Sequence, residues 1–145
     1  MANVAMAQPA AGAVAARVAA VRLQLTAFRN YASLRLELEP VSCVLTGPNG
    51  AGKTNVLEAL SLLAPGRGLR RAPLKELRRD GDGPFAVHGC FLTPDGVTAV
   101  GTGLDPESER RVVHVDGVVR SGPAALADVT GAVWLTPAMD RLFVE

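Results

Sequence analysis

The sequence Gly47-Pro48-Asn49-Gly50-Ala51-Gly52-Lys53-Thr54 matches the pattern G-x-x-x-x-G-K-[ST] of a phosphate-binding loop. A triphosphate carries concentrated negative charge, so its binding site needs several backbone N–H groups that point at the phosphates. Glycines let the backbone adopt positive φ angles and approach the phosphates without an intervening Cβ atom. Lys53 is expected to reach the β- and γ-phosphates, and Thr54 to place its hydroxyl on Mg²⁺. We therefore predict that residues 47–54 bind a nucleoside triphosphate and Mg²⁺.

The segments on either side of this loop have the pattern expected around it. Residues 41–46 are short, mostly apolar and β-branched, which predicts a buried strand. Residues 55–64 are apolar on most sides, and polar residues recur at spacing three, at Asn55, Glu58 and Ser61. Such a narrow polar stripe is typical of a helix buried against a sheet. The loop therefore lies between a strand and a helix, and the positive end of the helix faces the bound anion.

The rest of the chain reads mainly as antiparallel strands. Alternating apolar and polar residues predict two half-buried strands, over 21–26 and 34–38, which we expect to form a hairpin with a longer loop. Asp116-Gly117 is a strong two-residue hairpin signal. An antiparallel meander is predicted, with strands over 85–92, 97–104, 111–115 and 118–120, followed by a short helix at 124–129 and a strand at 132–136. The predicted fold class is α/β, a P-loop nucleotide-binding fold with an antiparallel β-subdomain.

The composition limits the number of domains and the kinds of partner. With 145 residues the chain is one domain or a piece of one. Its formal net charge is +1, so any nucleic-acid site must be local. The alanine-rich start lacks the charged region of a signal peptide, and we expect residues 1–17 to be a flexible extension. No run approaches the ~20 apolar residues of a membrane span, and Cys43 and Cys90 are expected to be buried thiols without a metal.

Three features go beyond the general phosphate-binding pattern. The run Phe28-Arg29-Asn30-Tyr31 lies one hairpin upstream of the loop, Asn49 precedes Gly50, and Asn55 and Glu58 follow in the helix. Together they resemble the beginning of the RecF family, bacterial DNA replication and repair proteins that are SMC-like members of the ABC ATPases. The resemblance spans about Val21 to Glu145. It includes Gly66-Arg67-Gly68-Leu69-Arg70, where Gly68 stands at a position at which Ser is commoner in the family.

The resemblance implies a cofactor, partners and a domain division. Residues 18–145 would form the N-terminal portion of an ABC-type ATPase head that stops before the Walker B and signature motifs. The residues implied to bind ATP and Mg²⁺ are Gly47, Pro48, Asn49, Gly50, Ala51, Gly52, Lys53 and Thr54, with Arg29 and Asn30 beside the nucleotide. The full-length protein would form an ATP-dependent homodimer in the bacterial cytoplasm, at the nucleoid. It would bind single-stranded DNA and gapped or junction duplex DNA, and would help to load RecA with RecO and RecR. Because the groups that position the attacking water are missing, we expect the fragment alone not to hydrolyse ATP.

One basic cluster follows the predicted nucleotide-binding helix. It contains Arg67, Arg70, Arg71, Lys75, Arg78 and Arg79 against a single acidic residue, Glu76. Arginine forms bidentate hydrogen bonds with phosphates, so Arg67, Arg70 and Arg71 are candidates for contacts with DNA or a protein partner. The alternative is a solvated loop and a short helix over 73–79. No aromatic residue is interleaved here, so stacking on bases is not indicated.

Other functions and one competing motif also have to be weighed. An SMC-like ATPase of another branch, such as an OLD-family nuclease, shares the same loop and would differ in a carboxylate-rich domain further along the chain. A P-loop kinase needs a substrate pocket after the helix, where this sequence has an arginine-rich loop. A relic loop without nucleotide is disfavoured by the intact Lys53 and Thr54. The run Val112 to Asp116 resembles a Walker B strand, but we interpret Asp116 as a hairpin residue because Gly117 follows it.

Overall fold

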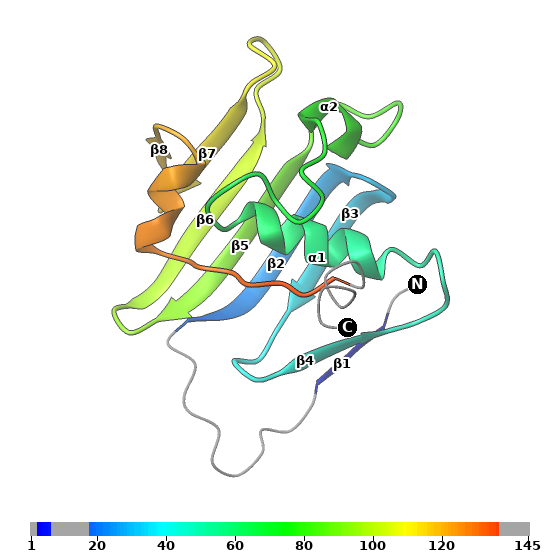
Figure 1. Cartoon of the computed structure of the whole chain (residues 1–145), viewed down its shortest axis with the longest axis vertical. Coiled ribbons are helices and arrows are strands. Elements are labelled where there is room, and N and C mark those ends of the chain that lie inside the picture. Colours follow the sequence, from blue (N-terminus) through cyan, green and yellow to red (C-terminus); the bar gives the residue numbers. More distant parts are fainter. Residues whose placement is uncertain (1–2, 7–17, 137–145) are drawn as a thin grey trace, which may run out of the picture.

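A six-stranded antiparallel sheet forms the centre of the molecule in a computed structural model, which describes residues 3–6 and 18–136. The strand order is β3-β2-β5-β6-β7-β8. The strands are β2 (Ala19–Phe28), β3 (Tyr31–Glu37), β5 (Ala86–Thr93), β6 (Gly96–Leu104), β7 (Arg111–Val115) and β8 (Val118–Arg120). Figure 1 shows helix α1 (Lys53–Leu62) lying across one face of this sheet. The predicted hairpin and the predicted meander are therefore parts of one sheet, joined by β2 and β5.

The core lies between α1 and the covered face of the sheet. Alternate residues of the strands point to the helix and are almost fully buried, as in Leu23, Leu25 and Val87. The helix contributes a matching apolar surface to the same cluster: Val56, Ala59, Leu62 and the following Leu63. Burial of apolar surface, at roughly 25 cal/mol per Å², thus holds the helix that begins at the phosphate-binding loop against the sheet.

The hairpin of β2 and β3 is tighter than the sequence suggested. Phe28 pairs with Tyr31, so only Arg29 and Asn30 connect the two strands and the expectation of a longer loop was wrong. Arg29 has a φ of 51°, in the left-handed region that two-residue turns require. The Asp116-Gly117 turn is confirmed, with φ values of 49° and 78°. The Asp116 carboxylate accepts a hydrogen bond from the Ala99 backbone at 2.8 Å, so it has a structural role in the hairpin.

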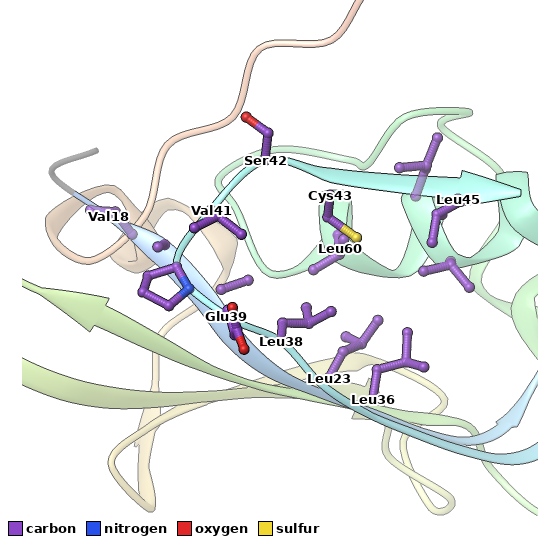
Figure 2. A pocket seen from close by; sticks show the side chains of 15 residues that line it. Val18, Leu23, Leu36, Leu38, Glu39, Val41, Ser42, Cys43, Leu45 and Leu60 are labelled. Carbon is purple, nitrogen blue, oxygen red and sulfur yellow. The ribbon is translucent and has the colours of Figure 1, made fainter. Parts of the chain in front are cut away.

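The strand before the phosphate-binding loop differs from its prediction. Strand β4 (Cys43–Thr46) was expected to be buried, but it is largely exposed, and its described pairing is with β1 (Asn3–Met6). An apolar cavity of about 320 Å³ separates β4 from the sheet, and Figure 2 shows side chains of β4, α1 and the β2–β3 hairpin lining it.

Two further expectations differ from the structure. The strand at Asn3–Met6 departs from the flexible extension expected over 1–17, whose other residues lie outside the described ones. Cys43 is exposed and Cys90 half-buried, so neither is the buried thiol expected.

Two short helices and a terminal segment complete the described chain. Helix α2 (Leu74–Leu77) follows the basic loop, and η1 (Pro123–Asp128) is a 3₁₀ helix at the position of the predicted short helix. The strand predicted at 132–136 is absent, because residues 131–136 run past α1 without strand pairing. Thr130 attaches this segment to the helix by donating a hydrogen bond to the Leu63 carbonyl at 2.6 Å. In the described part of the chain, no helix has the length and hydropathy needed to cross a membrane.

Candidate functional site: a phosphate-binding cavity

The loop before α1 has the backbone geometry that its glycines predict. Gly50 and Gly52 have φ values of 83° and 94°, a conformation that side chains with a Cβ atom rarely adopt. Gly52 is the N-cap of α1, and its carbonyl accepts the first helical hydrogen bond from Val56 at 3.1 Å. The unpaired N–H groups of the first helical turn, together with the helix dipole, favour an anion at this end.

The hairpin turn packs directly on this loop. A Cβ atom at Gly52 would lie 2.5 Å from the Tyr31 hydroxyl and 2.6 Å from the Asn30 side-chain amide, so glycine is needed here for space as well as for φ. The Tyr31 hydroxyl donates a hydrogen bond to the Ala51 carbonyl at 3.2 Å. Burial raises the pKa of Tyr31 above its ordinary value, and the hydroxyl is a protonated donor at neutral pH in any case. The hairpin turn and the loop, which are about twenty residues apart in the sequence, are thereby in direct contact.

A polar cavity of about 310 Å³ opens in front of the loop. It is lined by Asn30, Asn49, Gly50, Gly52, Lys53, Thr54, Asn55 and Arg70. The Lys53 ammonium donates hydrogen bonds to the carbonyl oxygens of Gly47 and Pro48 at 2.5 and 2.7 Å, so it lies over the start of the loop. Lys53 and Arg70 place two positive charges at the cavity, next to the N-terminus of α1. Such an arrangement suits a polyanionic phosphate group.

The predicted site residues are distributed unequally around this cavity. Of the phosphate-binding stretch, the residues from Asn49 to Thr54 other than Ala51 line it, while Gly47, Pro48 and Ala51 contribute carbonyl contacts behind it. Asn30 lines the cavity as expected from its position, whereas Arg29 does not. A phosphate contact by Arg29 therefore stays a prediction.

The basic cluster is divided in the same way. Arg70, which was a candidate for DNA or a partner, lines the phosphate cavity, while Arg67 and Arg71 are exposed away from it. An adjoining hollow of about 510 Å³ shares Asn30, Asn55 and Arg70 with the first. Its other lining residues are Arg29, Lys75, Glu76, Arg78 and Asp80. Arg70 thus lies where the phosphate cavity and the surface of mixed charge meet.

The polar stripe on α1 belongs to the site, although its spacing in the sequence did not indicate such a role. Glu58 and Ser61 are 1% and 4% exposed and face protein, whereas Asn55 is half-buried and lines the cavity. Asn55 donates to the Asn30 side chain at 2.8 Å, and Glu58 pairs with Arg29 and Arg70. The available signal was Glu58, the one acidic residue of this helix, because a buried carboxylate requires a charged partner.

The donor set is compatible with Mg²⁺. Thr54 is exposed at the first turn of α1 and lines the cavity. Among residues 18–136 no group of three or more His, Cys, Asp or Glu side chains could hold a metal ion without other ligands. Mg²⁺ commonly keeps several waters and binds through one or two protein groups together with substrate phosphates. The Thr54 hydroxyl fits such a role, in which the ion would neutralise phosphate charge.

Comparisons with known proteins give one matching family model and a set of sequence relatives that are named RecF. Residues 43–98 match the family model described as AAA domain, putative AbiEii toxin, Type IV TA system. The chain is 50% identical over 126 residues to the DNA replication and repair protein RecF of Mesorhizobium japonicum, covering 84% of this chain and 33% of that protein. It is 45% identical over 130 residues to the RecF protein of Rhizobium leguminosarum bv. trifolii, covering 88% of this chain and 35% of that protein.

Solved structures support the fold. A structure of the recombination mediator protein RecF with ATP superposes with a TM-score of 0.74 at 23% identity, over 89% of this chain and 36% of that one. A structure from a study of ATP-driven dimerization and DNA-stimulated activation of SMC ATPases superposes with a TM-score of 0.64 at 16% identity, over 86% of this chain and 96% of that one. The chain therefore has the fold of these RecF and SMC structures. The chain spans about a third of the length of the curated relatives that it matches, and over 84–88% of its own length its sequence is similar to these RecF proteins.

Proposed function

We propose that this chain binds ATP with Mg²⁺ and is part of an ATP-gated DNA-binding protein of replication and recombinational repair. The observation that carries the proposal is the polar cavity, in which Lys53, Thr54 and the glycine loop face Asn30 and Arg70. The ATP-bound RecF structure with the same fold supports ATP as the nucleotide. In the intact protein, ATP would join two heads on DNA, and hydrolysis would release them.

The proposed DNA ligands are single strands and gapped or junction duplexes. The proposed role is to help RecO and RecR to load RecA in the bacterial cytoplasm. Arg70 offers a physical route for coupling, because it lines both the phosphate cavity and the hollow that contains Lys75 and Arg78. A change in its position on nucleotide binding would alter the charge presented on that surface. Arg67 and Arg71, which are exposed nearby, are proposed to contact DNA phosphates or a protein partner.

Nucleotide binding is tested by titrating the 145-residue chain into a fluorescent ATP analogue with Mg²⁺. Lys53→Ala is expected to weaken binding by roughly 10- to 100-fold, the effect of losing charge-assisted hydrogen bonds of about 1.5–3 kcal/mol. Lys75→Ala is the matched control, because Lys75 is the second of two lysines and its side chain is 69% exposed. Equal affinities of the two variants would reject the site.

DNA gating is tested separately, by fluorescence anisotropy of a gapped DNA with the intact protein. We expect a non-hydrolysable ATP analogue with Mg²⁺ to tighten binding, and Lys53→Ala to remove this tightening. DNA affinity that is indifferent to nucleotide would leave the ATP site in place and reject the switch. The nuclease and kinase alternatives would then be tested next.

A further inference from the structure

The buried carboxylate of Glu58 is a group for which nucleotide binding alone gives no reason. It lies on α1 one turn after Thr54, and its side chain is only 2% exposed. Burial of an isolated carboxylate is costly, so the surrounding structure has to provide cationic hydrogen-bond donors. Removing one partner from such a group leaves an uncompensated buried charge. Glu58 therefore restricts the positions of the side chains that donate hydrogen bonds to it.

Two arginines from distant parts of the chain donate to Glu58. Arg29, in the hairpin turn, forms a bidentate pair in which Nε and Nη2 lie 2.9 Å from the two carboxylate oxygens. Its third nitrogen, Nη1, donates to the Glu76 carbonyl at 2.9 Å. Arg29 thus ties the hairpin turn to both α1 and α2, and its side chain is largely buried at 20% exposure.

Arg70 is held more loosely. Its Nη1 lies 3.2 Å from a Glu58 carboxylate oxygen and 3.2 Å from the Asn55 side-chain oxygen, and its side chain is 44% exposed. Within the described residues, no hydrogen bond to protein engages Nε or Nη2 of Arg70. One edge of the guanidinium is therefore anchored on α1, and donors remain for oxygens in the cavity that Arg70 lines.

We propose that Glu58 is a positioning residue for nucleotide binding, acting through Arg70. Arg29 neutralises most of the charge of the buried Glu58 carboxylate and fixes its orientation. One carboxylate oxygen of Glu58 also accepts a hydrogen bond from Arg70, and this bond holds Arg70 at the phosphate cavity. Without Glu58, Arg70 loses its charged anchor and must be ordered by the nucleotide, which costs side-chain entropy on binding. This inference rests on the proposed binding of ATP at the cavity.

The test is a double-mutant cycle with Glu58→Gln and Arg70→Ala in the 145-residue chain. The fluorescent ATP analogue with Mg²⁺ is the probe. Each single substitution is expected to raise Kd by roughly 5- to 10-fold, as for loss of one charge-assisted contact. The double variant is expected to show no greater rise than Arg70→Ala alone, because both changes remove the same interaction. Glu107→Gln, which removes an exposed carboxylate elsewhere, is the charge-matched control.

A purely structural role for Glu58 predicts a different result. Its replacement would then weaken binding in the Arg70→Ala background by the same factor as in the unsubstituted protein, and that additivity overturns the proposal. An unchanged Kd for Glu58→Gln also overturns it.

A second variant covers the case in which Glu58→Gln does not fold. Glu58→Asp keeps the charge while retracting it by one methylene, and the same non-additivity with Arg70→Ala is required. If the unsubstituted protein does not bind the analogue, both proposals fail. If it binds and Lys53→Ala abolishes binding while the cycle is additive, the positioning role fails alone.

Discussion

The guanidinium of Arg111, on strand β7, donates a hydrogen bond to the carbonyl oxygen of Leu62, the last residue of α1, at 2.5 Å. A second nitrogen donates to the Gly66 carbonyl at 2.7 Å, and Nε donates to the Thr102 hydroxyl at 3.0 Å. A cation at this end of the helix compensates carbonyls that have no helical partner. Arg111 thereby joins the meander to the end of the nucleotide-binding helix.

Replacing Arg111 is expected to destabilise the fold without touching the cavity. Arg111→Met keeps most of the apolar stem but leaves the carbonyls of Leu62 and Gly66 without their donor. Hydrogen bonds with a charged partner contribute about 1.5–3 kcal/mol, so we expect a loss of about 2 kcal/mol in the free energy of unfolding by urea. Arg110→Met is the control, because Arg110 is exposed. Equal stability of the two variants would contradict the role assigned to Arg111.

The two glycines of the phosphate-binding loop are expected to respond differently to alanine. Both have positive φ, but only Gly52 also lacks space, since its Cβ would contact Tyr31 and Asn30. Gly50 has no atom within 4 Å of the added carbon, so its cost is mainly backbone strain of about 1 kcal/mol. We expect Gly52→Ala to weaken binding of the ATP analogue clearly more than Gly50→Ala. A larger effect at Gly50 would argue against the packing of the hairpin turn on the loop.

Ser61 is expected to control the segment that carries Arg70. Its hydroxyl accepts a hydrogen bond from the Leu69 backbone at 2.7 Å and donates to the Glu58 carbonyl at 2.6 Å. Ser61→Ala leaves the Leu69 N–H without its partner, at a cost of about 1–3 kcal/mol. Urea unfolding should show this loss, and Ser33→Ala, on the exposed side of β3, should show almost none. Unchanged stability of Ser61→Ala would mean that Leu69 finds another acceptor.

Asp105, in the loop between β6 and β7, is expected to make the stability of the fold depend on pH in the acidic range. The backbone and hydroxyl of Ser108, with the backbone of Glu107, donate to the Asp105 carboxylate and lower its pKa. A lowered pKa in the folded state gives stability that is fully present above the ordinary value of about 3.9 and is lost as pH falls through the lower folded value. The melting temperature of the unsubstituted protein should exceed that of Asp105→Asn at pH 7, and the difference should shrink below about pH 4. A difference that is constant over this range would contradict the assignment.

Neighbouring residues were sufficient to predict much of the site and most of the helices and strands. The glycines, lysine and threonine of residues 47–54 specify a turn into a helix, and alternating side chains specify the strands of the two hairpins. These features depend on neighbouring residues only. Polar residues in α1 were also visible, but their spacing alone could not show whether they faced water or protein.

The strand order of the sheet and the side chains around the cavity depend on contacts between residues that are far apart in the sequence. The register of β2 against β5, with Gln24 opposite His88, brings residues more than sixty positions apart into one sheet, and no local periodicity encodes it. The same packing buries Glu58, brings Arg29 to it and carries Arg70 into the phosphate cavity. A loop of phosphate-binding type in front of a helix could be predicted from residues 47–62 alone, because adjacent residues build that geometry. The other side chains that complete the cavity could not be predicted in this way, because three-dimensional packing selects the partners of a buried charge.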